Sequence, residues 1–370
     1  MISELRISAD SHVLEPPEVF EPLASRFGER APHVVYSAEK GYELDNGRGR
    51  RSPIGGLATA GIDPRSPDWD EAFKRGYDVL PSLRDGRERA KDQDRDGVAA
   101  EVLYPSLMFS TFSRQEEETD LVVASFASYN AWLADHVKDA PGRLFGLACL
   151  QLKDLDAAIA EMERAKQLGH VGVCIPCTAP LHRPYSDRFY DRFWAAAQEM
   201  SMPLTLHIAT GAADIMPAYF RERSHHSWIM QPAIAGVLIN DLILSGVCER
   251  FPGIKFVPTE FDAGWLSTHL PRMDWAHYRF GDQGGLTMDP SEYWRRNFLA
   301  TFEDDAAVVR VRDLIGVKTL MWANDYPHGD SIWPESQETL DRIMQGCTPD
   351  DRHKLIAKNV VDLYGLPFEA

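Results

Sequence analysis

The chain has 370 residues, of which 44% are hydrophobic, and these values are typical of a globular protein that buries a sizeable core. Its 56 Asp and Glu residues outnumber its 39 Lys and Arg residues, and the net charge of −17 disfavours binding to nucleic acid or to an anionic membrane. The sequence shows no signal peptide or membrane span, and five cysteines do not suggest a disulfide framework, so we expect a cytoplasmic protein.

Short apolar runs recur along the chain, and helix-length amphipathic segments such as 153–168 and 186–200 lie between them. The runs are 5–10, 99–106, 143–152, 171–177, 203–209, 255–261, 298–304 and 319–325. Each is almost continuously apolar, as are strands that are buried on both faces of a parallel sheet. This alternation predicts an α/β fold of the (β/α)8 TIM barrel type. An open doubly wound sheet is the alternative, but no glycine-rich phosphate turn follows the first run.

The first predicted strand is followed by a Pro-rich segment and not by a helix. Residues 16–85 are rich in Pro, Gly and Arg, and they predict a long insertion that covers the mouth of the barrel. A second excursion, 211–228, separates the fifth strand from its helix, and residues 336–366 supply the closing helices. We therefore expect one domain over residues 1–370.

Polar residues lie at the carboxyl ends of several predicted strands, where barrels carry their catalytic groups. Asp10 and His12 end the first strand, and residues two apart on a strand point to the same side. His207 lies near the end of the fifth strand, Glu260 at the end of the sixth and Asp325 at the end of the eighth. A barrel brings these ends together around one axis.

Asp10, His12, His207 and Asp325 combine two imidazoles with two carboxylates, a set that suits one divalent metal ion. A bound cation lowers the pKa of water, and Asp325 is the predicted general base because it could contact both metal and water. His207 and Glu260 are the other candidate catalytic residues, with Glu260 supporting the site or transferring a proton. Neutral imidazole suits zinc, iron or manganese, and of these we expect zinc, with manganese as the alternative. Each residue also has a structural interpretation: a polar strand end, a hydrogen-bonded core histidine, or a turn cap before Pro327.

Other motifs give weaker indications of function. Cys174 and Cys177 form a C-x-x-C pair at a strand end, which favours buried, inert thiols over redox chemistry. The basic segment 47–51 and Arg65 could recognise a substrate carboxylate, although a solvated loop is the alternative. The following residues have no assigned role, or only one in packing: His225 and His226 in a loop that could act as a lid, His328, Trp265 and Trp322.

The sequence resembles the amidohydrolase superfamily, and most closely its amidohydrolase-related branch, which includes aminocarboxymuconate semialdehyde decarboxylase and aromatic-acid decarboxylases. The matching stretches are ISADSHVLEP, DQDRDGVAAEVLYPS, YSDRFYDRFWAAAQEMSMPLTLH, TEFDAGW, MWANDYPH and KNVVDLYGL. The resemblance implies a (β/α)8 barrel with one metal ion, commonly zinc or manganese. It also implies Asp10, His12, His207 and Asp325 as the ligands, and a possible homodimer.

The sixth predicted strand departs from the pattern of the decarboxylases, which generally carry a histidine there in a His-x-Gly-Glu run. This chain has Glu260-Phe261-Asp262-Ala263, and a carboxylate cannot donate to an anionic substrate unless it is protonated. We therefore predict hydrolysis of a small organic substrate, cyclic or derived from an aromatic compound. The alternatives are non-oxidative decarboxylation of an aromatic or unsaturated carboxylic acid, and a catalytically silent barrel that serves as a binding protein.

Overall fold

The computed structural model describes residues 4–211 and 229–369, and its centre is a curled parallel β-sheet. Six strands pair in chain order: β1 (Ile7–His12), β5 (Ala100–Tyr104), β6 (Leu144–Cys149), β7 (Gly172–Pro176), β8 (Leu204–His207) and β9 (Phe256–Thr259). The strands β10 (Ala300–Phe302) and β11 (Leu320–Trp322) form a second, two-stranded parallel sheet. Each predicted strand is present at its expected place. The apolar runs located the strands because a strand buried on both faces is apolar along its whole length.

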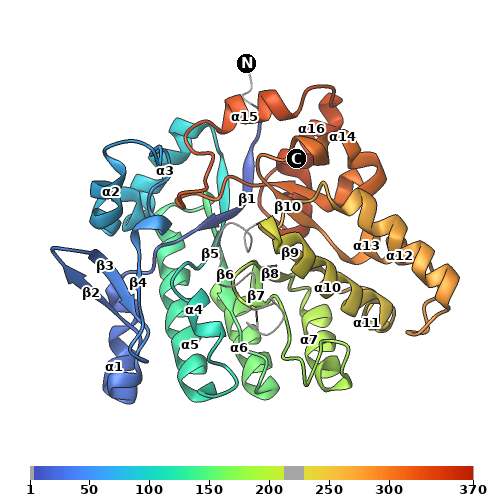
Figure 1. Ribbon diagram of the computed structural model, residues 1–370, viewed down its shortest axis with the longest axis horizontal. Helices are drawn as coiled ribbons and strands as arrows, with labels where there is room; N and C mark the ends of the chain where they lie inside the picture. Colours follow the sequence, from blue (N-terminus) through green and yellow to red (C-terminus); the bar gives the residue numbers. More distant parts are fainter. Residues whose placement is uncertain (1–3, 212–228, 370) are drawn as a thin grey trace.

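Backbone contacts join the two-stranded sheet to the larger sheet on both sides. Phe298 bridges to Phe256 of β9, and the Leu299 N–H donates to the Phe256 carbonyl over 3.0 Å. On the other side, the Asp325 N–H donates to the Asp10 carbonyl over 3.0 Å, next to β1. The strands consequently curl around a common centre, and most of the helices lie outside them (Figure 1). The predicted α/β class is confirmed, and the structure shows its parallel strands as a curled sheet.

The helices that follow the strands start and stop as their sequences indicate. Asp154 caps α6 (Leu155–Leu168) by accepting from the N–H groups of Asp156 and Ala157, and Gly169 ends it in a left-handed conformation with φ of +94°. Among the described residues between β5 and β11, the α-helices are α4 (Phe109–Phe112), α5 (Thr119–His136), α6 (Leu155–Leu168), α7 (Asp191–Met200), α10 (Gln231–Leu244), α11 (Val247–Arg250), α12 (Leu266–Phe280), α13 (Pro290–Asn297) and α14 (Ala306–Ile315). None of the helices within residues 4–211 and 229–369 is both long and apolar enough to cross a membrane.

The segment between β1 and β5 has regular structure of its own. The strands β2 (His33–Ser37), β3 (Gly41–Asp45) and β4 (Arg51–Pro53) form an antiparallel sheet, and the helices are α1 (Glu21–Phe27), α2 (Trp69–Arg75) and α3 (Gly86–Asp96). Figure 1 places β2–β4 at one side of the molecule. Of the second excursion, 211–228, only Gly211 belongs to the described residues, so His225 and His226 lie outside them.

The chain closes with the expected C-terminal helices. These are α15 (Ser336–Ile343), α16 (Pro349–His353), the π-helical turn η9 (Lys354–Lys358) and α17 (Asn359–Tyr364). Asn359 anchors this segment under the sheet, because its side-chain amide donates to the carbonyls of Val317 and Leu320, each over 2.7 Å. The last helices are thereby tied to the short helical turn η8 (Val317–Thr319) and to the start of β11.

Candidate metal centre

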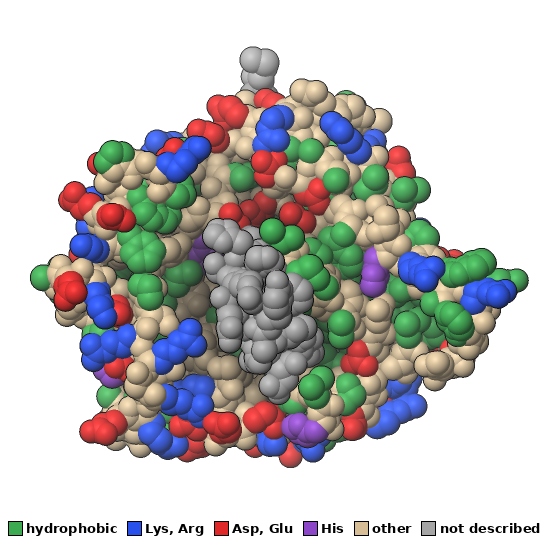
Figure 2. All heavy atoms as spheres, viewed as in Figure 1, with side chains coloured by type: hydrophobic (Ala, Val, Ile, Leu, Met, Phe, Trp, Pro, Cys, Tyr) green, Lys and Arg blue, Asp and Glu red, His purple; other side chains and the backbone are tan. Residues whose placement is uncertain are grey.

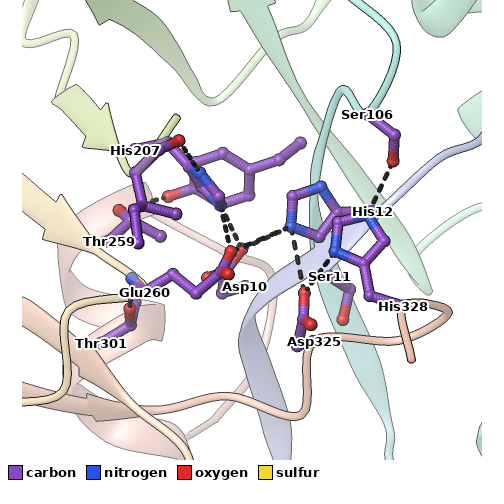
Figure 3. A network of polar contacts seen from close by, with 12 residues as sticks. Asp10, Ser11, His12, Ser106, His207, Thr259, Glu260, Thr301, Asp325 and His328 are labelled. Carbon is purple, nitrogen blue, oxygen red and sulfur yellow. Dashed lines mark hydrogen bonds and ion pairs between the residues drawn. The ribbon is translucent and has the colours of Figure 1, made fainter. Parts of the chain in front are cut away.

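The structure brings together the five residues that the sequence singled out, and it adds His328. Asp10 and His12 come from β1, His207 ends β8, Glu260 follows β9, and Asp325 follows β11. Ligand atoms of Asp10, His12, His207 and Glu260 lie within 4.8 Å of one another, as do those of His12, Glu260, Asp325 and His328. Figure 3 shows these side chains pointing toward one another from the ends of separate strands.

Two imidazole nitrogens face the carboxylates at this centre. The His12 Nε2 atom lies 3.2 Å from Asp325 Oδ1 and 3.5 Å from Asp10 Oδ1. The His207 Nε2 atom lies 3.5 Å from the same Asp10 oxygen and 3.1 Å from Glu260 Oε2. His12, His207, Asp10 and Asp325 are all at most 1% exposed, so the cluster is screened from solvent.

The outer nitrogen of each ring sets which tautomer the histidine adopts. His12 Nδ1 lies 2.7 Å from the Pro105 carbonyl oxygen, and His207 Nδ1 lies 2.8 Å from the Ile208 carbonyl oxygen. A carbonyl can only accept, so each Nδ1 carries a proton, and a neutral ring then presents its Nε2 lone pair to the cluster. Metal-binding histidines are held in this way, with the other ring nitrogen donating to a carbonyl or carboxylate.

Several polar atoms of the cluster have no hydrogen-bond partner. They are Nε2 of His12 and of His207 and both carboxylate oxygens of Asp10 and of Asp325, all of them buried. Each unsatisfied buried polar group costs about 1–3 kcal/mol. A divalent cation would satisfy several of these atoms at once, so the donor set fits a metal ion.

The electrostatics of the cluster favour positive charge. Burial by itself lowers the pKa of His12, but Asp10 and Asp325 raise it well above its usual value. Burial likewise opposes the charged form of His207, yet Asp10 and Glu260 raise its pKa to about 9. Burial would raise the pKa of Asp325, whereas His328 and His12 lower it below the usual range. The carboxylates thus stay ionised and attract cations, which is what a metal site requires.

Two glutamates near the centre hold protons more tightly than usual. Burial and the charge of Asp325 raise the pKa of Glu260 to about 7, although His207 opposes the shift. Glu303 directly follows β10, and burial together with the charges of Asp325 and Glu260 raises its pKa well above the ordinary value. Burial and, after it, the crowding of negative charge cause both shifts.

Glu260 and Asp325 also share an unusual backbone. Their φ angles are +63° and +52°, in the left-handed region that costs about 1–2 kcal/mol for a residue with a side chain. The Glu260 N–H donates to Thr301 Oγ1 over 2.9 Å, and the Asp325 N–H donates to the Asp10 carbonyl. These bonds hold the conformation that turns both carboxylates inward, and strain of this kind is concentrated at functional sites.

Sequence reasoning left His328 without a role and missed Glu15 and Ser106. His328 Nδ1 lies 3.0 Å from Asp325 Oδ1, and its Nε2 lies 2.9 Å from Ser106 Oγ. The buried Glu15 carboxylate accepts from the backbone N–H groups of Ser106, Leu107 and Met108. This network orders the loop after β5 against the centre. The only signal available in the sequence was that His328 follows Asp325 by three residues.

Arg89 is a further residue that the sequence did not indicate. It lies on α3 and is 1% exposed, and its Nε donates to Glu101 Oε2 over 2.6 Å. Its two Nη atoms donate to the carbonyls of His12 and Tyr326. Arg89 therefore fixes the backbone just beyond the ends of β1 and β11, where His12 and Asp325 are placed.

The remaining polar motifs lie elsewhere. Arg48 pairs with Glu117 and Glu118, and Arg51 pairs with Asp45, so two of the three arginines of segment 47–51 are used in internal ion pairs. Arg65 similarly pairs with Asp63 over 3.0 Å. Cys174 and Cys177 are buried, and burial raises their thiol pKa values to about 12 and about 11, as expected for inert cysteines.

A cavity of about 410 Å³ adjoins the centre through Glu260. Its polar lining includes the carboxylates Glu260, Asp262, Glu303, Asp304 and Asp330, and its apolar lining includes Ile208, Phe261, Phe302 and Ile332. No Lys or Arg belongs to this lining within the part of the chain that the structure describes. Figure 2 shows red acidic side chains gathered in a hollow near the middle of this face. The cavity is the natural place for a substrate next to the proposed ligands.

Comparison with known proteins identifies relatives of this chain. The Amidohydrolase family model matches residues 69–366. The chain is 25% identical to a gamma-resorcylate decarboxylase from Polaromonas sp. over 294 residues, which cover 73% of this chain and 83% of that protein.

Solved structures share the fold. An amidohydrolase from Mycobacterium avium subsp. paratuberculosis has a TM-score of 0.76 at 19% identity, covering 99% of this chain and 100% of the other. A dihydroxybenzoic acid decarboxylase from Polaromonas sp., solved with manganese and 2-nitroresorcinol, has a TM-score of 0.70 at 18% identity, covering 99% and 98%. With most of its length matched by the family model, the chain belongs to the amidohydrolase family and is a metal-dependent hydrolase or carboxy-lyase of that superfamily.

Proposed function

We propose that this enzyme is a metal-dependent carboxy-lyase that removes a carboxyl group from a hydroxylated aromatic acid without oxidation. The observation that carries the proposal is the set of buried, unpartnered ligand atoms on Asp10, His12, His207 and Asp325. The named relatives support this reaction over hydrolysis, which the sequence alone had favoured. The proposal thus adopts the alternative interpretation of the sequence.

Asp10, His12, His207 and Asp325 would hold the metal ion, and Glu260 lies beside them. The sequence favoured zinc, but we propose manganese, which the two imidazoles and two carboxylates suit as well as they suit zinc. The manganese in the similar decarboxylase structure supports the same choice. When bound, the cation supplies positive charge that polarises the substrate oxygens beside it.

The residues around the cavity would supply the proton that decarboxylation needs. The bond between ring and carboxyl carbon breaks, its electron pair stays on the ring carbon, and carbon dioxide leaves. A carboxyl group must then protonate that ring carbon. Glu260 lines the cavity and lies 3.1 Å from His207, so we assign it this role, and solvent restores its proton. Asp325 would hold the metal and keep His12 in place.

Hydrolysis remains the second candidate because of the charge of the cavity. Five carboxylates line it, and the histidine that decarboxylases of this branch carry after the sixth strand is replaced by Glu260. Such a cavity disfavours an anionic substrate unless a cation offsets the repulsion. In a hydrolase, Asp325 would instead act as general base and take a proton from the attacking water.

The proposal also includes the complete (β/α)8 barrel as a single domain over 1–370, with residues 16–85 covering its mouth. Contacts next to Asp325 support this arrangement. The Ala60 N–H donates to the Pro327 carbonyl, the Gly329 N–H donates to the Gly56 carbonyl, and Ser82 Oγ lies 2.6 Å from the Tyr326 hydroxyl. The insertion would thereby shield the substrate from water.

The homodimer stays a prediction that sedimentation equilibrium would test.

Product analysis separates the proposals. Purified protein loaded with Mn²⁺ is given γ-resorcylate, other hydroxybenzoates and carboxymuconate analogues, and carbon dioxide release is measured. A matched panel of esters and lactones tests hydrolysis, with Asp325→Asn as the inactive control. We expect carbon dioxide from at least one acid. Turnover of an ester or lactone with none of the acids would contradict the carboxy-lyase, and inertness of metal-loaded protein toward both panels would favour the silent barrel.

A further inference from the structure

A second cavity lies at the opposite end of the strands and has no part in the proposed reaction. Its volume is about 340 Å³, and Lys255, Arg295, Lys318, Lys354, Lys358 and Asp362 provide its charged lining. Lys255 directly precedes β9, and Lys318 lies two residues before β11, whereas the proposed metal ligands follow these strands or end them. This basic cavity therefore opens at the amino ends of the strands, away from the metal centre.

The charge of the basic cavity contrasts with that of the whole chain. Five cations and one carboxylate line it, although the net charge of the protein is −17. Lys354 pairs with Asp350, and Lys358 pairs with Asp362 over 3.1 Å. The positive groups of the other three residues have no carboxylate counterpart among the residues that the structure describes.

The hydrogen bonds of these three cations go only to neutral acceptors among the described residues. Lys255 Nζ donates to the Arg296 carbonyl over 2.5 Å, and Arg295 donates to Ser291 Oγ and to the Leu314 carbonyl over 3.1 Å and 3.3 Å. The Lys318 ammonium group, which lines the same cavity, makes no hydrogen bond or ion pair with residues 4–211 and 229–369. Burial and the nearby positive charge of Arg296 lower the pKa of Lys255. A bound anion would relieve this repulsion.

The backbone that carries the cations is held firmly. Asn359 ties the start of α17 to the carbonyls of Val317 and Leu320, on both sides of Lys318. The Trp294 indole donates to Thr319 Oγ1 over 3.1 Å, which fixes α13 and its Arg295 beside the same turn. Lys354 and Lys358 mark the two ends of the π-helical turn η9, a rare structure that is frequent at functional sites.

We propose that the basic cavity is a binding site for a small phosphate-bearing anion. Ammonium and guanidinium groups bind phosphate oxygens through charge-assisted hydrogen bonds, and Arg295 can do so with two donors at once. The volume suits an anion between pyrophosphate and a nucleotide in size. The acidic surface of the chain as a whole disfavours a long nucleic acid as the ligand.

Isothermal titration calorimetry with inorganic pyrophosphate and, separately, ADP tests the site and distinguishes a free anion from a phosphate ester. Because both anions also bind metal, the titrations use the metal-loaded enzyme and the His12→Ala/His207→Ala variant. We expect one saturable site in both proteins, with a Kd below about 1 mM at low salt. Affinity should fall as salt rises, because the lining is partly exposed to solvent.

Substitutions in the cavity complete the test. Lys318→Met keeps the aliphatic stem and should weaken binding about tenfold, and Lys318→Met/Arg295→Met about a hundredfold. Lys138→Met, which removes a lysine paired with Asp135 on the surface, should bind as the wild type does. Carbon dioxide release and metal content should not change in the cavity variants. The proposal would be overturned if neither anion showed saturable binding. It would also be overturned if Lys318→Met/Arg295→Met bound the anions as tightly as the wild type.

Discussion

His328 stacks on His12 with ring centroids 3.8 Å apart, and both imidazoles contact the same oxygen, Oδ1 of Asp325. The stack holds the His12 ring from one side while the Pro105 carbonyl fixes its Nδ1. His328 thus positions two of the proposed ligands, because it stacks on His12 and contacts Asp325. His328 therefore acts on the centre through Asp325 and His12, even if it does not bind the metal.

This arrangement predicts the effect of replacing His328. His328→Phe keeps a ring for the stack but removes the nitrogen that lies 3.0 Å from Asp325 Oδ1. Since partners that orient metal ligands contribute about 10–100-fold to metal affinity or activity, we expect Mn²⁺ affinity to fall by that factor. Competition with a metal-binding dye measures it. Ser106→Ala removes only the outer hydrogen bond and should cause a smaller loss, and unchanged affinity in His328→Phe would contradict the assignment.

Arg89→Met should destabilise the fold severely. The substitution leaves Glu101 charged, buried and without its 2.6 Å partner, and breaking such a pair costs about 3–5 kcal/mol. Urea unfolding measures the change in free energy. Arg87→Met, on the exposed side of the same helix, is the control and should stay within about 0.5 kcal/mol of the wild type. Equal stability of the two variants would show that the Arg89 network contributes little.

His136 should make stability depend on pH. Burial, and next the positive charge of Arg89, lower its pKa to about 4 from an unfolded value of 6.5. The folded state therefore binds the proton less tightly, so stability falls as the pH drops below 6.5, and the loss is complete near pH 4. The full effect is about 3 kcal/mol. The free energy of unfolding of the wild type and of His136→Gln is measured at pH 7 and pH 4.5, and we expect it to decrease less in the variant. Equal decreases in the two proteins would contradict this prediction.

The cysteines should be almost unreactive in the folded protein. Cys149, Cys174, Cys177 and Cys248 are buried, and only Cys347 is partly exposed. Because the thiolate is the reactive form, burial protects the first four both by access and by a raised pKa. A colourless disulfide reagent that releases a coloured thiol should therefore titrate at most one group before denaturation and all five after it. Rapid modification of Cys174 or Cys177 would revive a redox role for the pair.

Parts of the molecule with a local signature could be predicted from the sequence. The strands were visible because burial on both faces demands uninterrupted apolar runs, and the polar residues at their ends, such as His207 and Asp325, then stood out. Topology brought these ends to one place, as the structure also shows. The position of each residue along its strand carried enough information to assemble the cluster.

Other parts depend on long-range partners that leave no local signature. Arg89 lies in a helix full of charged residues and looks like part of a solvated face, yet it pairs with Glu101 beneath the centre. The strands β2–β4 are short and partly polar, so they resemble loop. The basic cavity draws Lys255, Arg295 and Lys318 from three separate segments, and only the fold shows that they share one hollow.

Metal content tests the centre most directly. Elemental analysis of the purified chain, loaded with Mn²⁺ or Zn²⁺ and then freed of unbound ions, should find one ion per molecule. The His12→Ala/His207→Ala variant, which removes both nitrogen ligands, should retain none above background. Well under one ion per chain in the wild type, or equal metal in the variant, would contradict a metal centre built from Asp10, His12, His207 and Asp325.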